Sequence, residues 1–193
     1  MSSIRKSLTT GVFYTALAKY SGIFISIIIG AILARLLTPD EFGIVALVTV
    51  FVSFFNLLSD FGIGPAVVQN QSLTDEDIQS IFSFSILIGI ILAGIFFLIA
   101  PFIAKFYNKP ELIQVSRVLS LSILFFSWQI VPYALSQKAL KFKQIGLITL
   151  GVQLFSGIIA IILAYAGFSY YALVVQSILV SGITLVIFFI LAN

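Results

Sequence analysis

The chain carries very little charge. Charged residues make up 9% of its 193 residues and hydrophobic residues 61%, and the mean hydropathy is +1.20. A soluble domain has about a quarter charged residues, so a water-facing surface cannot be built from this composition. The sequence therefore predicts an integral membrane protein. Its long, continuous apolar runs favour α-helices over a β-barrel.

Two reactive residue types are absent. The sequence contains no cysteine and no histidine, which excludes disulfides, thiolate chemistry, imidazole dyads and the usual metal sites. An aspartyl protease would need two intramembrane aspartates, and only Asp60 lies in an apolar run. Gly62-Ile63-Gly64 is followed by Pro65, so it is not a phosphate-binding loop. We expect a protein that is not an enzyme and has no cofactor and no metal. The scattered net charge of +3 argues against nucleic acid.

The apolar runs divide into six segments, each close to the ~20 residues that cross a bilayer as a helix. We therefore expect an all-α polytopic membrane protein, with a single bundle of six transmembrane helices over residues 1–193 and no soluble domain. The expected spans are 8–37, 41–69, 75–106, 111–137, 144–166 and 169–191.

The clearest local signal lies between the first two spans. Thr38 can cap a helix, Pro39 suits its first position, and Glu41 completes a Thr-x-x-Glu capping box. These residues predict a tight reversal between two antiparallel helices. Thr74, followed by three acidic residues, predicts the start of the third span in the same way.

The distribution of Lys and Arg favours an N-terminus in the cytoplasm. The inner side would then carry six basic residues and the outer side four. The inner six are Arg5, Lys6, Lys19, Lys138, Lys141 and Lys143, and the outer four are Arg35, Lys105, Lys109 and Arg117.

Three ionisable residues, Lys19, Asp60 and Arg117, fall within apolar sequence. Charges in a membrane usually face a bundle interior or a wet cavity and often mark a substrate path. Measured by helical rise from Thr38, Lys19 lies about 28 Å and Asp60 about 33 Å along antiparallel helices. The two come to similar depth and could pair. Snorkelling is an equal alternative for Lys19, and for Arg117 snorkelling or a structural pair competes with substrate binding.

The run 59–65, Ser-Asp-Phe-Gly-Ile-Gly-Pro, weakens the second span because two glycines and a proline lie close together. We expect a helix break there, which either forms a gate or ligand site or only shapes packing. A second, weaker signal for a kink is Pro132 in the fourth span.

Two further patterns concern uncharged residues. Small residues recur at every fourth position and predict close helix packing in two spans: Ser26, Gly30 and Ala34 in the first, and Ser156, Ala160 and Ala164 in the fifth. Amide side chains are spread through the spans, where they either bond helices together or line a polar cavity for sugars: Asn56, Gln129, Gln153 and Gln176.

The run 33–43, Leu-Ala-Arg-Leu-Leu-Thr-Pro-Asp-Glu-Phe-Gly, closely resembles the first loop of Wzx-type polysaccharide exporters. These are the O-antigen and exopolysaccharide flippases of the multidrug/oligosaccharidyl-lipid/polysaccharide superfamily. Other pieces resemble the second span of that family, the start and end of its third span, and its basic loop before the fifth: 58–64 with 66–69, 74–77, 100–107 and 139–143.

The resemblance implies a function. Members of the family move undecaprenyl-pyrophosphate-linked sugar repeat units from the inner to the outer leaflet of the bacterial plasma membrane. They do so with two helix bundles that rock around a central cavity. Six spans match only the N-terminal bundle, so the resemblance implies a fragment of a longer transporter. The implied partners are membrane lipids, the lipid-linked oligosaccharide, and a second bundle or other polysaccharide export proteins.

The resemblance also suggests roles for the three ionisable residues. Lys19 and Arg117 would be cationic contacts for the pyrophosphate, and Asp60 would pair with Lys19 or sense a driving ion. Two alternatives stay open. A multidrug exporter of the same superfamily would share the bundle, although cationic drugs favour acidic residues in the cavity. A non-transporting membrane scaffold would assemble with other export proteins.

Overall fold

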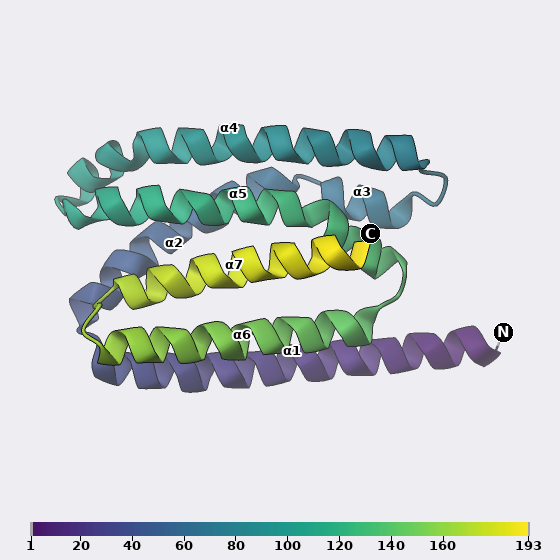
Figure 1. The fold of residues 1–193 in the computed structure, drawn as a ribbon, viewed down its shortest axis with the longest axis horizontal. Helices are drawn as coiled ribbons and strands as arrows, with labels where there is room; N and C mark the ends of the chain where they lie inside the picture. Colours follow the sequence, from purple (N-terminus) through teal and green to yellow (C-terminus); the bar gives the residue numbers. More distant parts are fainter. Residues whose placement is uncertain (1, 193) are drawn as a thin grey trace.

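The computed structural model describes the course of the chain over residues 2–192 and the side chains of residues 19–192. Within this range the chain is helical, with no strand (Figure 1). Arg5 and Lys6, which contribute to the predicted orientation, lie outside the residues with described side chains. The helices are α1 (Ser2–Leu36), α2 (Pro39–Asp60), α3 (Ile63–Gln69), α4 (Asp75–Tyr107), α5 (Glu111–Lys138), α6 (Phe142–Tyr165) and α7 (Tyr171–Ala192).

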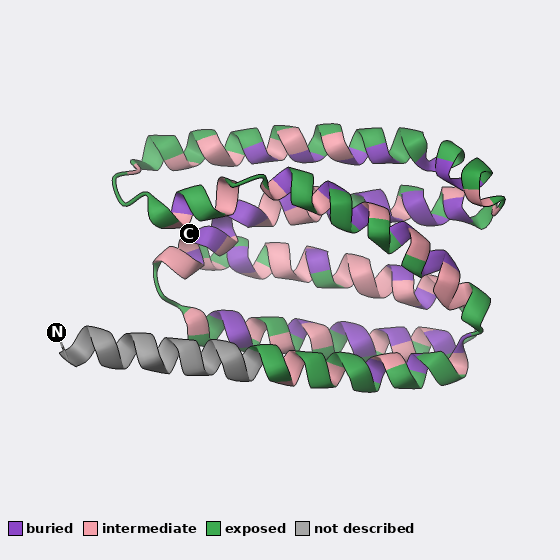
Figure 2. Ribbon diagram, turned by 180° about the vertical axis from the view of Figure 1, so that it is seen from behind, coloured by how far each residue is buried: buried purple, intermediate pink, exposed green. Residues whose placement is uncertain are grey.

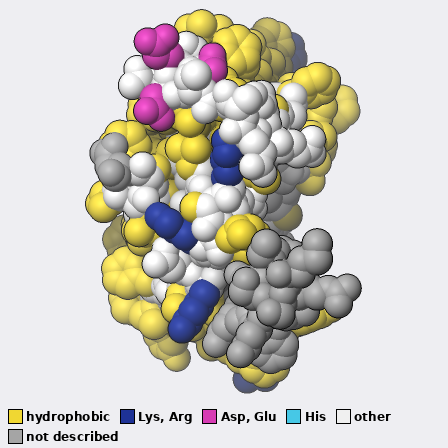
Figure 3. All heavy atoms as spheres, turned by 90° about the vertical axis from the view of Figure 1, so that its right-hand side faces the viewer, with side chains coloured by type: hydrophobic (Ala, Val, Ile, Leu, Met, Phe, Trp, Pro, Cys, Tyr) yellow, Lys and Arg dark blue, Asp and Glu magenta, His cyan; other side chains and the backbone are white. Residues whose placement is uncertain are grey.

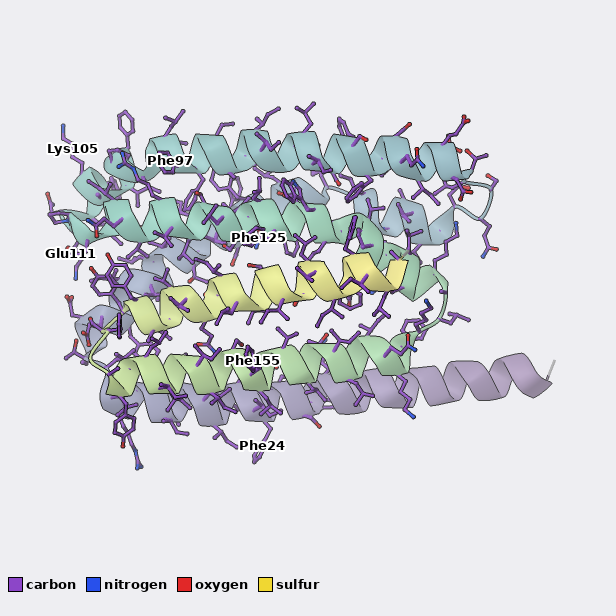
Figure 4. The ribbon with its side chains drawn as sticks, in the orientation of Figure 1. Phe24, Phe97, Lys105, Glu111, Phe125 and Phe155 are labelled. Atoms are coloured by element: carbon purple, nitrogen blue, oxygen red, sulfur yellow. The ribbon has the colours of Figure 1, made fainter. Side chains whose placement is uncertain are left out.

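Six helical segments among the described residues are long and apolar enough to cross a membrane, because α2 and α3 together form one span, Pro39–Gln69. The prediction of an all-α polytopic membrane protein is therefore confirmed. Exposed residues lie along the outer faces of these helices (Figure 2). Many of them are large hydrophobic side chains, as contact with lipid requires. Phe24, for example, projects outward from α1 (Figure 4).

The long helices α1, α4, α5, α6 and α7 lie roughly side by side along the long axis of the molecule, α2 crosses them at an angle, and α5 is the central helix (Figure 1). It packs against α4, α7, α2 and α3, whereas α1 packs on α6 and α6 on α7 (Figure 1). The main hydrophobic core lies between α2, α4 and α5. Among its most deeply buried side chains are Val48, Phe96, Leu112, Leu119 and Ile123.

The contact between α1 and α6 uses the predicted small residues of α6 only. These three are buried: Ser156, Ala160 and Ala164. In α1, Ser26 and Ala34 are exposed, and the helix instead buries the larger residues Ile29 and Leu33, followed by the buried Leu37 directly after its end. A Cβ added to Gly157 would lie 2.1 Å from Cδ1 of Ile29, so the isoleucine of α1 fits against the glycine of α6. The prediction for the α1 stripe was wrong, because an isoleucine fills the space that the α6 glycine leaves.

The turn between α1 and α2 ties together three loops at one end of the bundle. The Thr38 side chain accepts from the Glu41 amide at 3.4 Å, and the Glu41 carboxylate accepts from the Thr38 amide at 2.6 Å. The predicted capping box is confirmed. Asp40 forms an ion pair with Lys109 after α4, and Glu41 accepts a hydrogen bond from Ser169 before α7.

The opposite end of the bundle carries the other predicted cap. Thr74 accepts from the Asp77 amide at 3.2 Å, and Asp77 accepts from the Thr74 amide at 2.9 Å. Figure 3 views this end, where acidic and basic side chains gather while hydrophobic atoms cover the flanks. The acidic residues of the first turn of α4 are Asp75, Glu76 and Asp77, and the basic residues near the α5–α6 loop are Lys138, Lys141 and Lys143.

The predicted break in the second span is present between α2 and α3. Gly62 has φ +91°, a left-handed conformation that glycine adopts without steric cost. Phe61 beside it is 86% exposed. The Asp60 carboxyl group bridges the break, because its Oδ1 accepts from the Gly64 amide at 3.0 Å. Pro132, by contrast, lies inside α5, which continues through it as a single helix.

Candidate functional site

A cavity of about 940 Å³ lies inside the helix bundle. Ligand sites are typically about 300–1,000 Å³, so this one is large. Five helices contribute to its wall. The lining residues come from α2 and α3 (Val52, Asn56, Asp60, Gly64, Pro65, Val68, Gln69), α5 (Ser122, Phe126, Gln129, Ile130, Tyr133, Ala134, Gln137), α6 (Thr149, Val152, Gln153) and α7 (Gln176, Ser177, Val180, Ser181, Thr184).

The wall of the cavity is mostly apolar in area, carries several amides and hydroxyls, and is almost uncharged. Amides and hydroxyls make up its polar part, and Asp60 is its one ionisable carboxylate. The four amides noted in the sequence, Asn56, Gln129, Gln153 and Gln176, all lie on it. Gln153 also bonds helices together, because its Nε2 donates to the Gly22 carbonyl of α1 at 2.9 Å. All four amides therefore line the cavity, and Gln153 also joins α6 to α1.

Lys19 lines a second cavity of about 480 Å³ between α1, α5 and α6. This cavity adjoins the larger one. The two share four lining residues: Tyr133, Gln137, Thr149 and Gln153. Lys19 and Asp60, whose side chains are both described, do not form an ion pair. The structure thus places them in neighbouring cavities rather than in contact.

Arg117 lies away from both cavities. Its side chain is exposed near the start of α5, and its guanidinium carbon lies 4.9 Å from the centre of the Phe97 ring of α4. A cation over an aromatic face is a stabilising contact. The structure therefore brings Lys19 and Asp60 into adjoining cavities and leaves Arg117 on the α4 side of the bundle.

Two of the amides that line the large cavity have unsatisfied oxygens. Asn56 Oδ1 and Gln129 Oε1 are buried and have no hydrogen-bond partner among the described residues. Next to Gln129, the Trp128 indole N–H is also buried and unpartnered. Most buried polar groups in proteins are paired, so each exception calls for an explanation.

A metal site is not evident. Within the residues that the structure describes, no three His, Cys, Asp or Glu side chains gather closely enough to hold a metal ion. The chemistry available in the large cavity is hydrogen bonding by neutral groups, with one carboxyl group at the break between α2 and α3.

Comparison with known proteins identifies the family. The model of a family described as "Polysaccharide biosynthesis protein" matches residues 32–193. The chain belongs to this family. The predicted resemblance to Wzx-type polysaccharide exporters is thereby confirmed. The chain is a multi-pass bacterial membrane protein of polysaccharide biosynthesis.

Several relatives are named for related processes. The lipopolysaccharide biosynthesis protein WzxC of Escherichia coli is 26% identical over 76% of this chain and 30% of its own length. The succinoglycan biosynthesis transport protein ExoT of Rhizobium meliloti is 28% identical over 89% of this chain and 35% of its own length. The teichuronic acid biosynthesis protein TuaB of Bacillus subtilis is 26% identical over 83% of this chain and 32% of its own length. The chain spans about a third of the length of these relatives, and no solved structure matches it significantly.

Most of the residues that line the large cavity were not predicted from the sequence, although their spacing along the helices gives a signal. Along the second span, the lining positions recur at every fourth residue: Val52, Asn56, Asp60, Gly64 and Val68. Along α7 the same spacing recurs at Gln176, Val180 and Thr184. Residues spaced by four lie on one face of a helix. A polar residue within such a stripe marks the face that turns away from lipid.

Proposed function

We propose that this chain is part of a transporter that moves lipid-linked polysaccharide repeat units across the bacterial plasma membrane. The observation that carries the proposal is a large cavity lined in part by amides and hydroxyls, inside a bundle with an apolar exterior. A cavity of this kind offers hydrogen-bonding groups at a depth where lipid offers none. A glycan crossing the membrane needs such groups to replace its water shell.

The lipid carrier would follow a different path from the sugar. In this proposal the polyprenyl tail of an undecaprenyl-pyrophosphate-linked oligosaccharide stays in the bilayer, beside the apolar faces of the helices. Lys19 supplies positive charge in the adjoining cavity, where it attracts the pyrophosphate. Arg117 lies outside both cavities, so we restrict its role to contact with phosphate at the end of the bundle where α5 begins.

The chain would act together with further helices. We propose that its six spans form one bundle and that a second bundle, or another polysaccharide export protein, completes the site. The chain corresponds to about a third of the length of its relatives, which fits this arrangement. The excess of basic residues at the end carrying Lys138, Lys141 and Lys143 favours that end, and with it the N-terminus, in the cytoplasm. Moving the substrate requires no bond to be broken, and we propose no catalytic role.

A complementation experiment tests the function. This chain is expressed, together with the second bundle or partner export protein that completes the site, in a bacterial strain that lacks its own repeat-unit flippase but makes the lipid-linked oligosaccharide. We expect polysaccharide to return to the cell surface and the lipid-linked intermediate to stop accumulating on the inner leaflet. The proposal is wrong if the protein reaches the membrane in the amount of a working flippase and the intermediate still accumulates.

A further inference from the structure

We propose that Asn56 and Gln129 are the residues through which the large cavity recognises the hydroxyl groups of a glycan. The proposal rests on the transport function proposed above and states which part of the substrate this cavity accepts. Asn56 comes from α2 and Gln129 from α5, and both lie on the cavity wall.

The first argument is the state of these two amides. Asn56 Oδ1 and Gln129 Oε1 are buried without a hydrogen-bond partner among the described residues. A buried acceptor without a donor costs free energy, because the group has lost its water and gained nothing. The terminal torsions of Asn and Gln are broad, so a small rotation can turn either amide toward the cavity that it lines.

The second argument is a contrast on the same two helices. Ser59 on α2 and Ser127 on α5 are also buried, yet both hydroxyls have partners, and the two oxygens lie 2.9 Å apart. Ser59 donates to the Phe55 carbonyl at 3.0 Å, and Ser127 shares its hydrogen between Ser59 and the Ile123 carbonyl of its own helix, at 2.9 Å from each. The serines hold α2 and α5 together. The nearby amides do not take part in this bonding, so their polarity serves another purpose.

The third argument is the chemistry of the surrounding wall. A hydroxyl group both donates and accepts, which matches an amide with its carbonyl acceptor and its NH₂ donors. Phe126 and Tyr133 add aromatic surface, and the wall has no basic side chain. An uncharged, hydroxyl-rich ligand suits this wall, whereas a phosphate group does not. The sugar portion would occupy the large cavity, and the phosphates would lie outside it.

Removal of the two amides distinguishes a recognition role from a structural one. Asn56→Leu and Gln129→Leu keep approximately the same side-chain volume while they delete the unsatisfied groups. If the amides serve recognition, the double variant unfolds at the same temperature as the wild type or higher, because two buried oxygens without hydrogen-bond partners have been removed. Ser127→Ala is the matched control, since it removes a satisfied structural hydrogen bond from the same helix and should lower the unfolding temperature.

Binding is measured on the full chain in lipid nanodiscs, by saturation-transfer NMR with a neutral probe, maltotetraose, at millimolar concentration. Inorganic pyrophosphate is the second probe. We expect wild type and Ser127→Ala to transfer saturation to the sugar protons, and the double variant to bind about tenfold more weakly, as the loss of two hydrogen bonds gives. Pyrophosphate should not compete with the sugar.

Three results would overturn the inference: no sugar signal with the wild type, equal binding by the double variant, or a double variant that unfolds at a lower temperature than the wild type. These results are independent of the complementation experiment. Sugar contact that depends on the two amides, together with failed complementation, would support this inference and reject the transport function. Restored surface polysaccharide, together with unchanged sugar binding by the double variant, would support the transport function and reject this inference.

Discussion

The hydroxyl of Ser127 in α5 donates a hydrogen bond of 2.9 Å to the hydroxyl of Ser59 in α2, at a position where both residues are buried. The bond joins the two helices that contribute Asn56 and Gln129 to the large cavity, while neither serine lines the cavity itself.

Ser127→Ala should lower the free energy of unfolding by about 0.5–1.5 kcal/mol, the usual net value of one neutral hydrogen bond. Equilibrium unfolding in mixed micelles would measure it. Thr184→Ala is a suitable control, because its hydroxyl bonds only the Val180 carbonyl of its own helix. If the two variants lose the same free energy of unfolding, the hydrogen bond between α5 and α2 adds no stability beyond that of a bond within one helix.

Gly89 in α4 is required for close packing against α5. A Cβ at this position would lie 2.7 Å from the Ser127 Cβ, closer than real Cβ atoms approach. Gly89→Ala should therefore cost about 1–3 kcal/mol of stability through overpacking. Gly94 in the same helix has no atom within 4 Å of its added Cβ, so Gly94→Ala should be neutral or stabilise by up to about 1 kcal/mol. A Gly89→Ala variant as stable as Gly94→Ala would contradict the packing of α4 on α5.

Asp60 has two properties that substitution can separate. Asparagine keeps the Oδ1 acceptor for the Gly64 amide and loses the ionisable group, whereas alanine loses both. We expect Asp60→Asn to leave the unfolding temperature unchanged and Asp60→Ala to lower it. Transport in the complementation assay should fall in both variants if the ionisable group matters. Full transport by Asp60→Asn would assign Asp60 to the helix break alone.

Lys19 and Arg117 should differ in their effect on transport. Lys19→Ala removes the positive charge beside the cavities and should reduce transport roughly tenfold, as the loss of a charge-assisted contact does. Arg117→Ala should reduce it much less, because this side chain stacks on Phe97 outside both cavities. The rate at which lipid-linked oligosaccharide appears in the outer leaflet is the measurement. The reverse order of the two effects would move the phosphate contact to Arg117.

Features encoded by neighbouring residues were predictable from the sequence. Thr38 and Thr74 cap their helices as expected, since a capping box needs only four consecutive residues. The break at Gly62 follows from local backbone preference in the same way. The six membrane-length segments follow from the length of the apolar runs.

Features that depend on which helices are neighbours were not predictable. The sequence placed Lys19 and Asp60 at similar depth on consecutive, antiparallel spans, which left a pair between them open beside snorkelling of Lys19. In the structure α1 packs on α6, so the two residues line separate cavities. Arg117 could not be assigned a direction, because lipid and core are both apolar and the pattern of a membrane helix says little about its rotation.

The single tryptophan of the chain has a practical consequence. Trp128 precedes Gln129 in α5, its indole N–H is buried without a partner, and its ring lies against Gly89 of α4. All of the indole fluorescence of this protein therefore comes from one point on the central helix. A change in emission on addition of a glycan would report a change in the surroundings of Trp128, between Gln129 and α4, with no label attached.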